Sequence, residues 1–203
     1  MAHDAFWATL LGRRSVRRYT SRTIEPGLIE RLLAAAHQAP SAHNRQPWRF
    51  VLLEDGSTRH RLAEAMAASW RSDQLADEAD PDLVAARAAR SIERITSAPA
   101  AILPCLDLTA LDVYPDPQRQ QHEWQMGVQS VALACQNLLL AAHHLGLAAC
   151  WLCAPIFCTP LVQAILDLPA TLEPQALLTV GYAAADAPTT KAREPLHTRV
   201  IRI

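Results

Sequence analysis

The chain has 203 residues, half of them hydrophobic, and a formal net charge of -1 at pH 7. This length suits one domain with a substantial core, and the composition is that of a soluble globular protein. The near-zero charge argues against a general nucleic-acid-binding protein, which would carry a clear basic excess. The sequence has no run of eighteen apolar residues and no signal-peptide pattern at its start, so we expect a cytoplasmic protein without a membrane span.

Helices and short strands alternate in the hydrophobic pattern. Apolar residues three and four apart predict helices over residues 4–12, 27–38, 58–70, 82–96, 118–145 and 159–166. Short apolar or alternating runs predict strands over residues 49–54, 100–107, 149–154, 176–183 and 198–203. The pattern therefore predicts a single mixed α+β domain over residues 1–203.

Local signals refine these elements. Ser57 and Thr159 are expected to cap the helices that follow them. Pro104 marks its strand as an edge strand or a bulged one, because proline cannot donate to a neighbouring strand. The acidic residues 71–81 are expected to form a loop, either mobile or serving as a lid over a substrate.

The longest helix and the end of the chain bear on assembly. Between Gly127 and Leu140 the helix is apolar or small nearly all round, so we expect it to be buried in a core or against a second subunit. Residues 184–197 are expected to form a loose arm. A strand over residues 198–203, placed after such an arm, can add to the sheet of another chain.

The five cysteines argue against a redox or metal centre. An odd number of cysteines in apolar surroundings suits a reducing compartment. Cys150 and Cys153 have the spacing of a redox or metal-binding pair. No second cysteine or histidine pair follows at zinc-finger spacing, so we expect buried thiols and no metal site.

A basic segment, RRSVRRY at residues 13–19, is the first candidate for function. Like charges this close are costly unless an anion or water surrounds them, and the planar fork of arginine suits phosphate. A solvated basic turn would explain the same residues. A second segment, APSAHNRQPWRF at residues 39–50, makes a binding site the better interpretation.

Taken together, the two segments resemble the opening of the nitroreductase family, flavin-dependent reductases that bind FMN at a dimer interface. The sequence has no hydrolytic triad, P-loop or G-x-G-x-x-G motif, which agrees with chemistry carried by a bound cofactor. The resemblance implies an α+β fold with a central, mostly antiparallel sheet flanked by helices. It also implies a homodimer in which the C-terminal strand is exchanged.

The resemblance assigns the basic residues to the phosphate and ribityl chain of FMN. The first group is Arg13, Arg14, Ser15, Val16 and Arg17. In the family a basic pair near the C-terminus closes over the same phosphate, and Lys191 and Arg193 match it here. Exposed charge on a flexible arm is the alternative for these two residues.

Two further stretches are implied to approach the flavin ring. The first is the loop that the family usually contributes from the second subunit, matched here by Pro40, Ser41, Ala42, His43 and Asn44. His43 is either a substrate-facing donor or a surface residue, and Asn44 is alternatively a turn residue. The second is the strand GLAACWLC, in which Leu152 and Cys153 would offer backbone N–H groups near the flavin N5 atom.

A finer resemblance concerns one branch of the family. The stretch Trp70–Asp73 and several later segments look like the flavin domain of the two-domain protein of coenzyme F-420 biosynthesis. This resemblance implies reduction of the enolpyruvyl group of dehydro-F-420-0. It also implies that Asp73 contacts the deazaflavin; the alternative is that Asp73 is an ordinary carboxylate of a loop. Residues 44–48 depart from that branch and follow the general family.

Three functions therefore remain open at this point. The first is the reduction of dehydro-F-420-0, with hydride carried by FMN and no catalytic side chain assigned. The second is a broad NAD(P)H-dependent nitro or quinone reductase that accepts flat electron acceptors. The third is a flavin or deazaflavin carrier without catalysis. All three expect a homodimer that takes a small molecule, without nucleic-acid or membrane partners.

Overall fold

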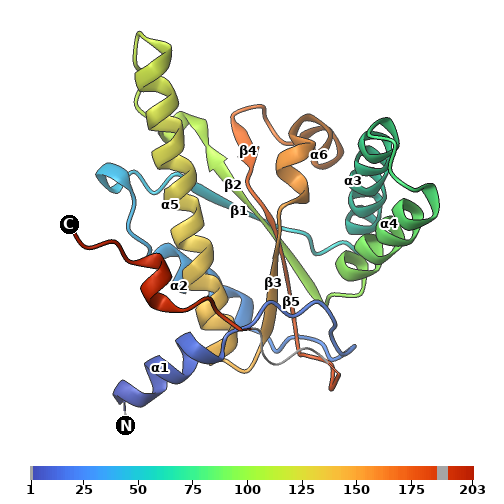
Figure 1. The fold of residues 1–203 in the computed structure, drawn as a ribbon, viewed down its shortest axis with the longest axis horizontal. Helices are drawn as coiled ribbons and strands as arrows, with labels where there is room; N and C mark the ends of the chain where they lie inside the picture. Colours follow the sequence, from blue (N-terminus) through green and yellow to red (C-terminus); the bar gives the residue numbers. More distant parts are fainter. Residues whose placement is uncertain (1, 187–191) are drawn as a thin grey trace.

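The structure is a computed structural model that describes residues 2–186 and 192–203. An antiparallel five-stranded sheet lies at its centre (Figure 1). The strands are β1 (Trp48–Leu52), β2 (Ala100–Asp107), β3 (Ala148–Leu152), β4 (Leu172–Pro174) and β5 (Leu177–Gly181). Their order is β1-β2-β5-β3, and β4 pairs with β2 beyond the end of β5. Sequence reasoning missed the three-residue strand β4.

Helices cover both faces of this sheet, which confirms the α+β architecture expected from the sequence. They are α1 (Ala2–Gly12), α2 (Leu28–His37), α3 (Gly56–Ala76), α4 (Pro81–Thr96), α5 (Pro117–His144) and α6 (Thr159–Leu166). In the described part of the chain, none of them is long and apolar enough to cross a membrane.

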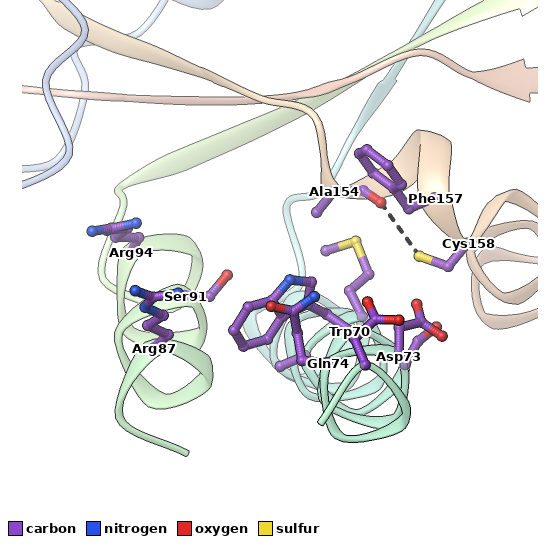
Figure 2. A pocket seen from close by; sticks show the side chains of 13 residues that line it. Trp70, Asp73, Gln74, Arg87, Ser91, Arg94, Ala154, Phe157 and Cys158 are labelled. Carbon is purple, nitrogen blue, oxygen red and sulfur yellow. Dashed lines mark hydrogen bonds between the residues drawn. The ribbon is translucent and has the colours of Figure 1, made fainter. Parts of the chain in front are cut away.

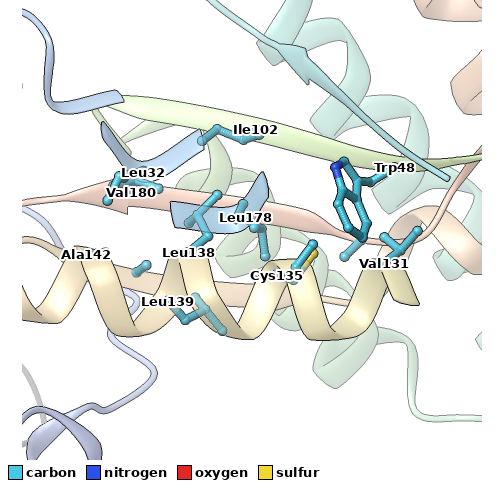
Figure 3. Close-up of a cluster of buried hydrophobic side chains, with 14 of the residues drawn as sticks. Leu32, Trp48, Ile102, Val131, Cys135, Leu138, Leu139, Ala142, Leu178 and Val180 are labelled. Carbon is cyan, nitrogen blue, oxygen red and sulfur yellow. The ribbon is translucent and has the colours of Figure 1, made fainter. Parts of the chain in front are cut away.

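Two hydrophobic cores lie on opposite faces of the sheet. Along β2, Ile102 and Leu106 enter the core under α2 and α5, whereas Leu103 and Cys105 enter the core under α3, α4 and α6. Successive side chains of a strand point to opposite faces, so a strand covered on both sides is apolar throughout. Figure 3 shows the first core, in which Leu138 of α5 lies against the sheet.

Pro104 lies in a central strand, opposite a bulge in the segment that joins β4 to β5. Between the pair of Ile102 with Leu178 and the pair of Cys105 with Pro174, two residues of β2 face three residues of that segment, so the extra residue belongs to the neighbour of β2. Pro104 itself keeps the regular register with Phe50 of β1, and its carbonyl accepts the backbone N–H of Gln175 at 2.9 Å. The expected edge strand is wrong, and the expected bulge is found in the neighbouring segment rather than in the strand of Pro104.

The acidic loop predicted over residues 71–81 is wrong. Helix α3 continues to Ala76, and only residues 77–80 separate it from α4. The residues after Trp70 include good helix formers, and this last part of α3 runs beside α4. Polarity was mistaken there for a lack of structure, whereas it marks the exposed face of a helix.

Two expected helix caps are also displaced. Asp55, not Ser57, caps α3, because its carboxylate accepts the backbone N–H groups of Ser57 and Thr58. At α6 the cap position belongs to Cys158, and Thr159 is the first helical residue. Both helices begin where expected to within about two residues, which is the usual uncertainty of a helix end.

Two surfaces have no partner among the described residues of the single chain. Leu196–Arg199 forms a short 3-10 helix, and Val200, Ile201 and Ile203 are exposed, so the strand expected over 198–203 does not form here. Helix α5 is buried on its sheet side, yet Leu133 on its other side is 46% exposed. The backbone groups of a strand must pair with a neighbouring strand, which a second chain could supply. Exchange of the C-terminal strand within a dimer therefore stays a prediction.

Candidate functional site

The basic segment is held in place by the sheet. The backbone N–H of Val16 donates to the carbonyl of Ala149 on β3 at 3.1 Å, and that of Thr20 donates to the carbonyl of Tyr182 after β5 at 2.8 Å. Ser15 also forms an isolated parallel bridge with Ala149. The segment therefore takes its conformation from two neighbouring strands rather than from local turn chemistry.

Tyr19 anchors the end of this segment. Its hydroxyl donates to the carbonyl of Val16 at 2.7 Å and lies 2.8 Å from the hydroxyl of Thr179, and burial raises the pKa of the phenol. Gly181 makes room for the ring, since a Cβ there would lie 3.0 Å from Tyr19 Cδ1 and 2.6 Å from Pro99 Cδ. A glycine is therefore required at this close approach.

The segment borders two separate cavities. Arg13, Arg14 and Val16 line a cavity of about 400 Å³ together with His143 and the Ala183–Ala185 backbone. Ser15 and Arg17 line a second cavity of about 470 Å³, together with Arg18, Arg90, Glu93, Arg94 and Ser97. Val16 alternates with Ser15 and Arg17, as expected of extended backbone. The residues expected to grip one phosphate and its ribityl chain are thus divided between the two sides of the segment.

In the part of the chain that the structure describes, positive charge gathers around the first cavity without an ionic partner. Burial, together with the guanidinium groups of Arg193 and Arg14, lowers the pKa of Arg13. Burial also lowers the pKa of His143, and the charges of Arg13 and Arg14 add to this effect. Among the described residues, Arg13, Arg14 and Arg193 form no salt bridge. Such a cluster is suited to a bound anion.

Arg14 supplies an independent indication of a missing partner. Its Nη1 group donates to the backbone carbonyls of Leu11 and Arg13. Its Nε atom is buried and has no hydrogen-bond partner in the described part of the chain. A buried donor without an acceptor is costly, and a phosphate oxygen would satisfy it. The residues present therefore fit a phosphate-bearing group. Lys191 lies outside the described residues.

The loop over residues 40–46 has an unusual backbone. His43, Asn44 and Gln46 have φ values of 50°, 54° and 49°, in the left-handed region that non-glycine residues rarely adopt. The Ser41 hydroxyl accepts the backbone N–H of Gln46 at 2.9 Å, and the Ala42 N–H donates to the hydroxyl of Ser130 on α5 at 3.3 Å. Strain held in this way is often found at functional sites.

The two halves of the expected site do not meet within one chain. The loop contacts α5 at Ser130, whereas the basic segment contacts it at His143 (Figure 1). Thirteen residues of α-helix correspond to about 20 Å. The structure therefore brings Arg193 to the basic segment but leaves Pro40, Ser41, Ala42, His43 and Asn44 at a distance from both.

Strand β3 passes close to two arginines that line the second cavity. Leu152 is the last residue of the strand, and Cys153 follows it in an exposed position. Burial raises the pKa of the Cys150 thiol, while the charges of Arg17 and Arg94 oppose that rise. These two arginines are thus close enough to β3 to act on it. In the described ranges, no group of three or more ligands could hold a metal ion.

A third cavity, of about 590 Å³, opens between α3 and α4 (Figure 2). Trp70 and Asp73 on α3 line it, which makes Asp73 a residue of a helix and not of a loop. Arg87 and Arg94 on α4 line the opposite side, and Arg94 also borders the second cavity. Sequence reasoning missed these arginines, although Arg87, Arg90 and Arg94 are spaced to lie near one face of a helix.

Comparison with known proteins assigns the chain to a family. The model of the nitroreductase family matches residues 10–182. A relative from Archaeoglobus fulgidus, provisionally named NADH dehydrogenase/NAD(P)H nitroreductase, is 31% identical over 140 residues, or 69% of this chain. The iodotyrosine deiodinase of Danio rerio is 27% identical over 187 residues, or 91% of this chain. Each match spans 62% of the relative's own length.

Solved structures agree with this result. A provisionally named nitroreductase from Desulfovibrio desulfuricans, solved in complex with FMN, superimposes with a TM-score of 0.74 at 26% identity, over 98% of this chain and 96% of that one. A provisionally named NADH oxidase from Clostridium acetobutylicum gives a TM-score of 0.71 at 28% identity, over 95% and 97%. The nitroreductase-like fold is thereby confirmed. The chain belongs to the nitroreductase family.

Proposed function

We propose that the protein is an FMN-dependent oxidoreductase that accepts electrons from NAD(P)H and passes them to a small, flat acceptor. The observation that carries the proposal is the cluster of Arg13, Arg14 and Arg193, which has no salt-bridge partner among residues 2–186 and 192–203, together with a buried Arg14 donor that has no acceptor there. The FMN complex of the Desulfovibrio relative and the nicotinamide in the name of the Archaeoglobus relative support it.

The residues would divide the work of holding the cofactor. Arg13, Arg14 and Arg193, with Lys191, would bind the phosphate, because charge-assisted hydrogen bonds to arginine are the strong ones. Ser15 and Arg17, on the other side of the segment, would face the ribityl chain and the ring. The backbone N–H groups at Leu152 and Cys153 would approach the flavin N5 atom. When bound, the flavin supplies the hydride, and the protein supplies position and electrostatics.

We propose that the site lies at the interface between the two subunits of a homodimer and that the protein works in the cytoplasm. The loop of residues 40–44 lies about 20 Å along α5 from the basic segment of its own chain, so a second copy would deliver it to the cofactor. The exposed side of α5 and residues 200–203 are the surfaces available for that contact. A two-fold dimer is the commonest closed assembly of soluble proteins.

Flavin content and turnover test the function. The purified protein should be yellow, and mass spectrometry of the molecule released by heat should give FMN. Under anaerobic conditions NADH or NADPH should bleach the flavin absorption, and a quinone or nitroaromatic compound should restore it. A protein that binds FMN but is not reduced by either nicotinamide would be a carrier. A colourless protein indifferent to added FMN would contradict the proposal.

Two mixing and truncation experiments test the dimer. An Arg13→Ala/Arg17→Ala variant and a variant with Ser41 and Asn44 replaced by Ala should each lose FMN. Unfolded and refolded together, they should regain about a quarter of the wild-type sites, because half of the dimers then carry one intact site. Removing residues 196–203 should weaken both dimerisation and FMN retention. Gel filtration at an unchanged size, with the yellow colour kept, would contradict this role for the C-terminus.

A specific observation favours one finer substrate. Trp70 and Asp73, from the stretch that resembles the coenzyme F-420 branch, both line the cavity between α3 and α4. The enolpyruvyl group of dehydro-F-420-0 would receive a hydride and a proton across its double bond. Incubation with that compound and a reductant should give a two-hydrogen gain in mass. No gain, with quinone turnover intact, would leave the broad nitro or quinone reductase.

A further inference from the structure

The cavity between α3 and α4 has the size and the walls of a binding site for an aromatic molecule. Its volume of about 590 Å³ lies within the range of small-molecule sites. Trp70 is half-buried in one wall, and Phe157, which is 79% exposed, lies at another. In Figure 2 the Trp70 indole lies between the arginines of α4 and Asp73. An indole in this position offers a flat surface on which a ring can stack.

Opposite charges lie on different walls of this cavity. Arg87 and Arg94 come from α4, whereas Asp73 lies in the last turn of α3 and Asp77 directly follows that helix. None of these four residues forms a salt bridge with another described residue. Because the charges do not neutralise one another, both walls remain available to a ligand.

The two arginines belong to one side of α4. They are seven residues apart, which is about two helical turns and about 10 Å along the axis. Long guanidinium side chains can reach an anion between two such positions, and arginine binds carboxylate in a planar, two-pronged fashion. The carboxylates of α3 and the negative end of its helix dipole would repel a second anionic group and favour a donor.

We infer that this cavity selects flat aromatic acceptors that carry one anionic group. The anion lies against Arg87 and Arg94, the ring packs on Trp70, and a hydroxyl or ring N–H at the far end faces Asp73. The inference rests on the proposed function and adds the substrate class. Arg94 also borders the cavity of Ser15 and Arg17, so this cavity adjoins the proposed flavin site.

Binding of a compound that cannot be reduced tests the inference apart from catalysis. Titration calorimetry of the FMN-loaded protein would compare 4-hydroxybenzoate with its neutral methyl ester. The acid should bind at least about tenfold more tightly, since a charge-assisted hydrogen bond contributes that much or more. Arg87→Gln and Arg94→Gln should each remove most of this difference and leave the ester unchanged. Equal affinities for acid and ester in the wild-type protein would overturn the inference.

Matched variants separate the parts of the cavity. Arg61→Gln removes the same charge from the part of α3 outside the cavity and should change neither affinity. Trp70→Leu should weaken the binding of the acid and of the ester to the same extent, because it removes ring stacking and leaves the charges in place. If Arg61→Gln reduced acid binding as much as Arg87→Gln, general electrostatics would explain the preference and the inference would fail.

Turnover gives a second, separate readout. With NADH or NADPH as donor, Arg87→Gln should raise KM for 3-nitrobenzoate, whose nitro group is not opposite its carboxylate, about tenfold, while KM for methyl 3-nitrobenzoate stays the same. If the wild-type protein contained no flavin, or oxidised no nicotinamide with either compound, the proposed function would be contradicted. Normal flavin content and turnover, without any preference for the acid, would contradict only the inference about the substrate.

Discussion

The basic segment and the loop of residues 40–46 hold their shapes by different means. The segment lies between β3 and the chain after β5, and its backbone hydrogen bonds run to both. The loop instead carries left-handed residues at His43, Asn44 and Gln46 and is closed by the hydroxyls of Ser41 and Ser130. The first geometry is imposed by the sheet, and the second is stored locally in strained backbone. Mutations should therefore act on stability and on binding in different proportions in the two regions.

The largest effect is expected from the charges of the basic segment. Arg13→Ala combined with Arg14→Ala removes two charge-assisted contacts to the phosphate, each contributing about 1.5–3 kcal/mol. FMN affinity should therefore fall at least about a hundredfold. The thermal stability of the flavin-free protein should change little, because the relief of repulsion between like charges offsets the loss of the hydrogen bonds from Arg14 to the carbonyls of Leu11 and Arg13. Fluorescence titration of FMN and a melting curve measure the two effects. Unchanged FMN affinity would show that the phosphate lies elsewhere.

A change beneath the segment should act through packing. Gly181→Ala places a methyl group against Pro99 and Tyr19, and overpacking of this kind costs about 1–3 kcal/mol. Denaturant unfolding of the flavin-free protein measures the loss. Gly56→Ala is the matched control, because nothing lies within 4 Å of a Cβ at that position. Equal stabilities of the two variants would mean that Tyr19 is not held as described.

The loop should respond to backbone preference. Asn44→Val puts a β-branched residue at a φ of 54° and should lower the free energy of unfolding by about 1–2 kcal/mol. Asn44→Gly loses the same side chain but tolerates this φ, so it should stay close to the wild-type stability. Both variants are compared by urea unfolding. If they behave alike, the side chain of Asn44 and not its backbone holds the loop.

The smallest effect concerns pH at the cation cluster. The pKa of His143 is lowered in the folded chain, so below about pH 6.5 the unfolded chain binds more protons and folding stability falls as the pH falls. His143→Gln should reduce the stability difference between about pH 7.5 and pH 5.5. Bound phosphate should reduce it as well, because an anion offsets the charges of Arg13 and Arg14. Melting curves of the wild-type protein and the variant, with and without FMN, measure both effects on the pH dependence of stability. An unchanged pH dependence in His143→Gln would contradict the placement of His143 beside Arg13 and Arg14.

The sequence predicted the fold well where hydrophobic periodicity was strong. Helix α5 and strand β2 agree with the expected ranges to within one residue, because α5 has apolar residues in every turn and β2 is apolar along nearly its whole length. The end of α3 was missed, since exposed polar helices and loops have similar compositions. Strand β4 was missed because three residues are too short to show a period.

The site was predictable only in part. The motifs marked the basic segment and the 40–46 loop, but spacing alone did not show that Ser15 and Arg17 face a different cavity from Arg13 and Arg14. That division depends on where the segment pairs with β3. The cavity between α3 and α4 depends on the angle between two helices, which no local pattern records.

The most direct test of the account compares FMN with riboflavin, which differ only in the phosphate. The protein, stripped of flavin, is titrated with each and followed by flavin fluorescence. We expect FMN to bind at least about a hundredfold more tightly, corresponding to about 2.7 kcal/mol or more contributed by the arginines around Arg13. Equal affinities for the two compounds, or no binding of either, would contradict the claim that this cluster holds a phosphate.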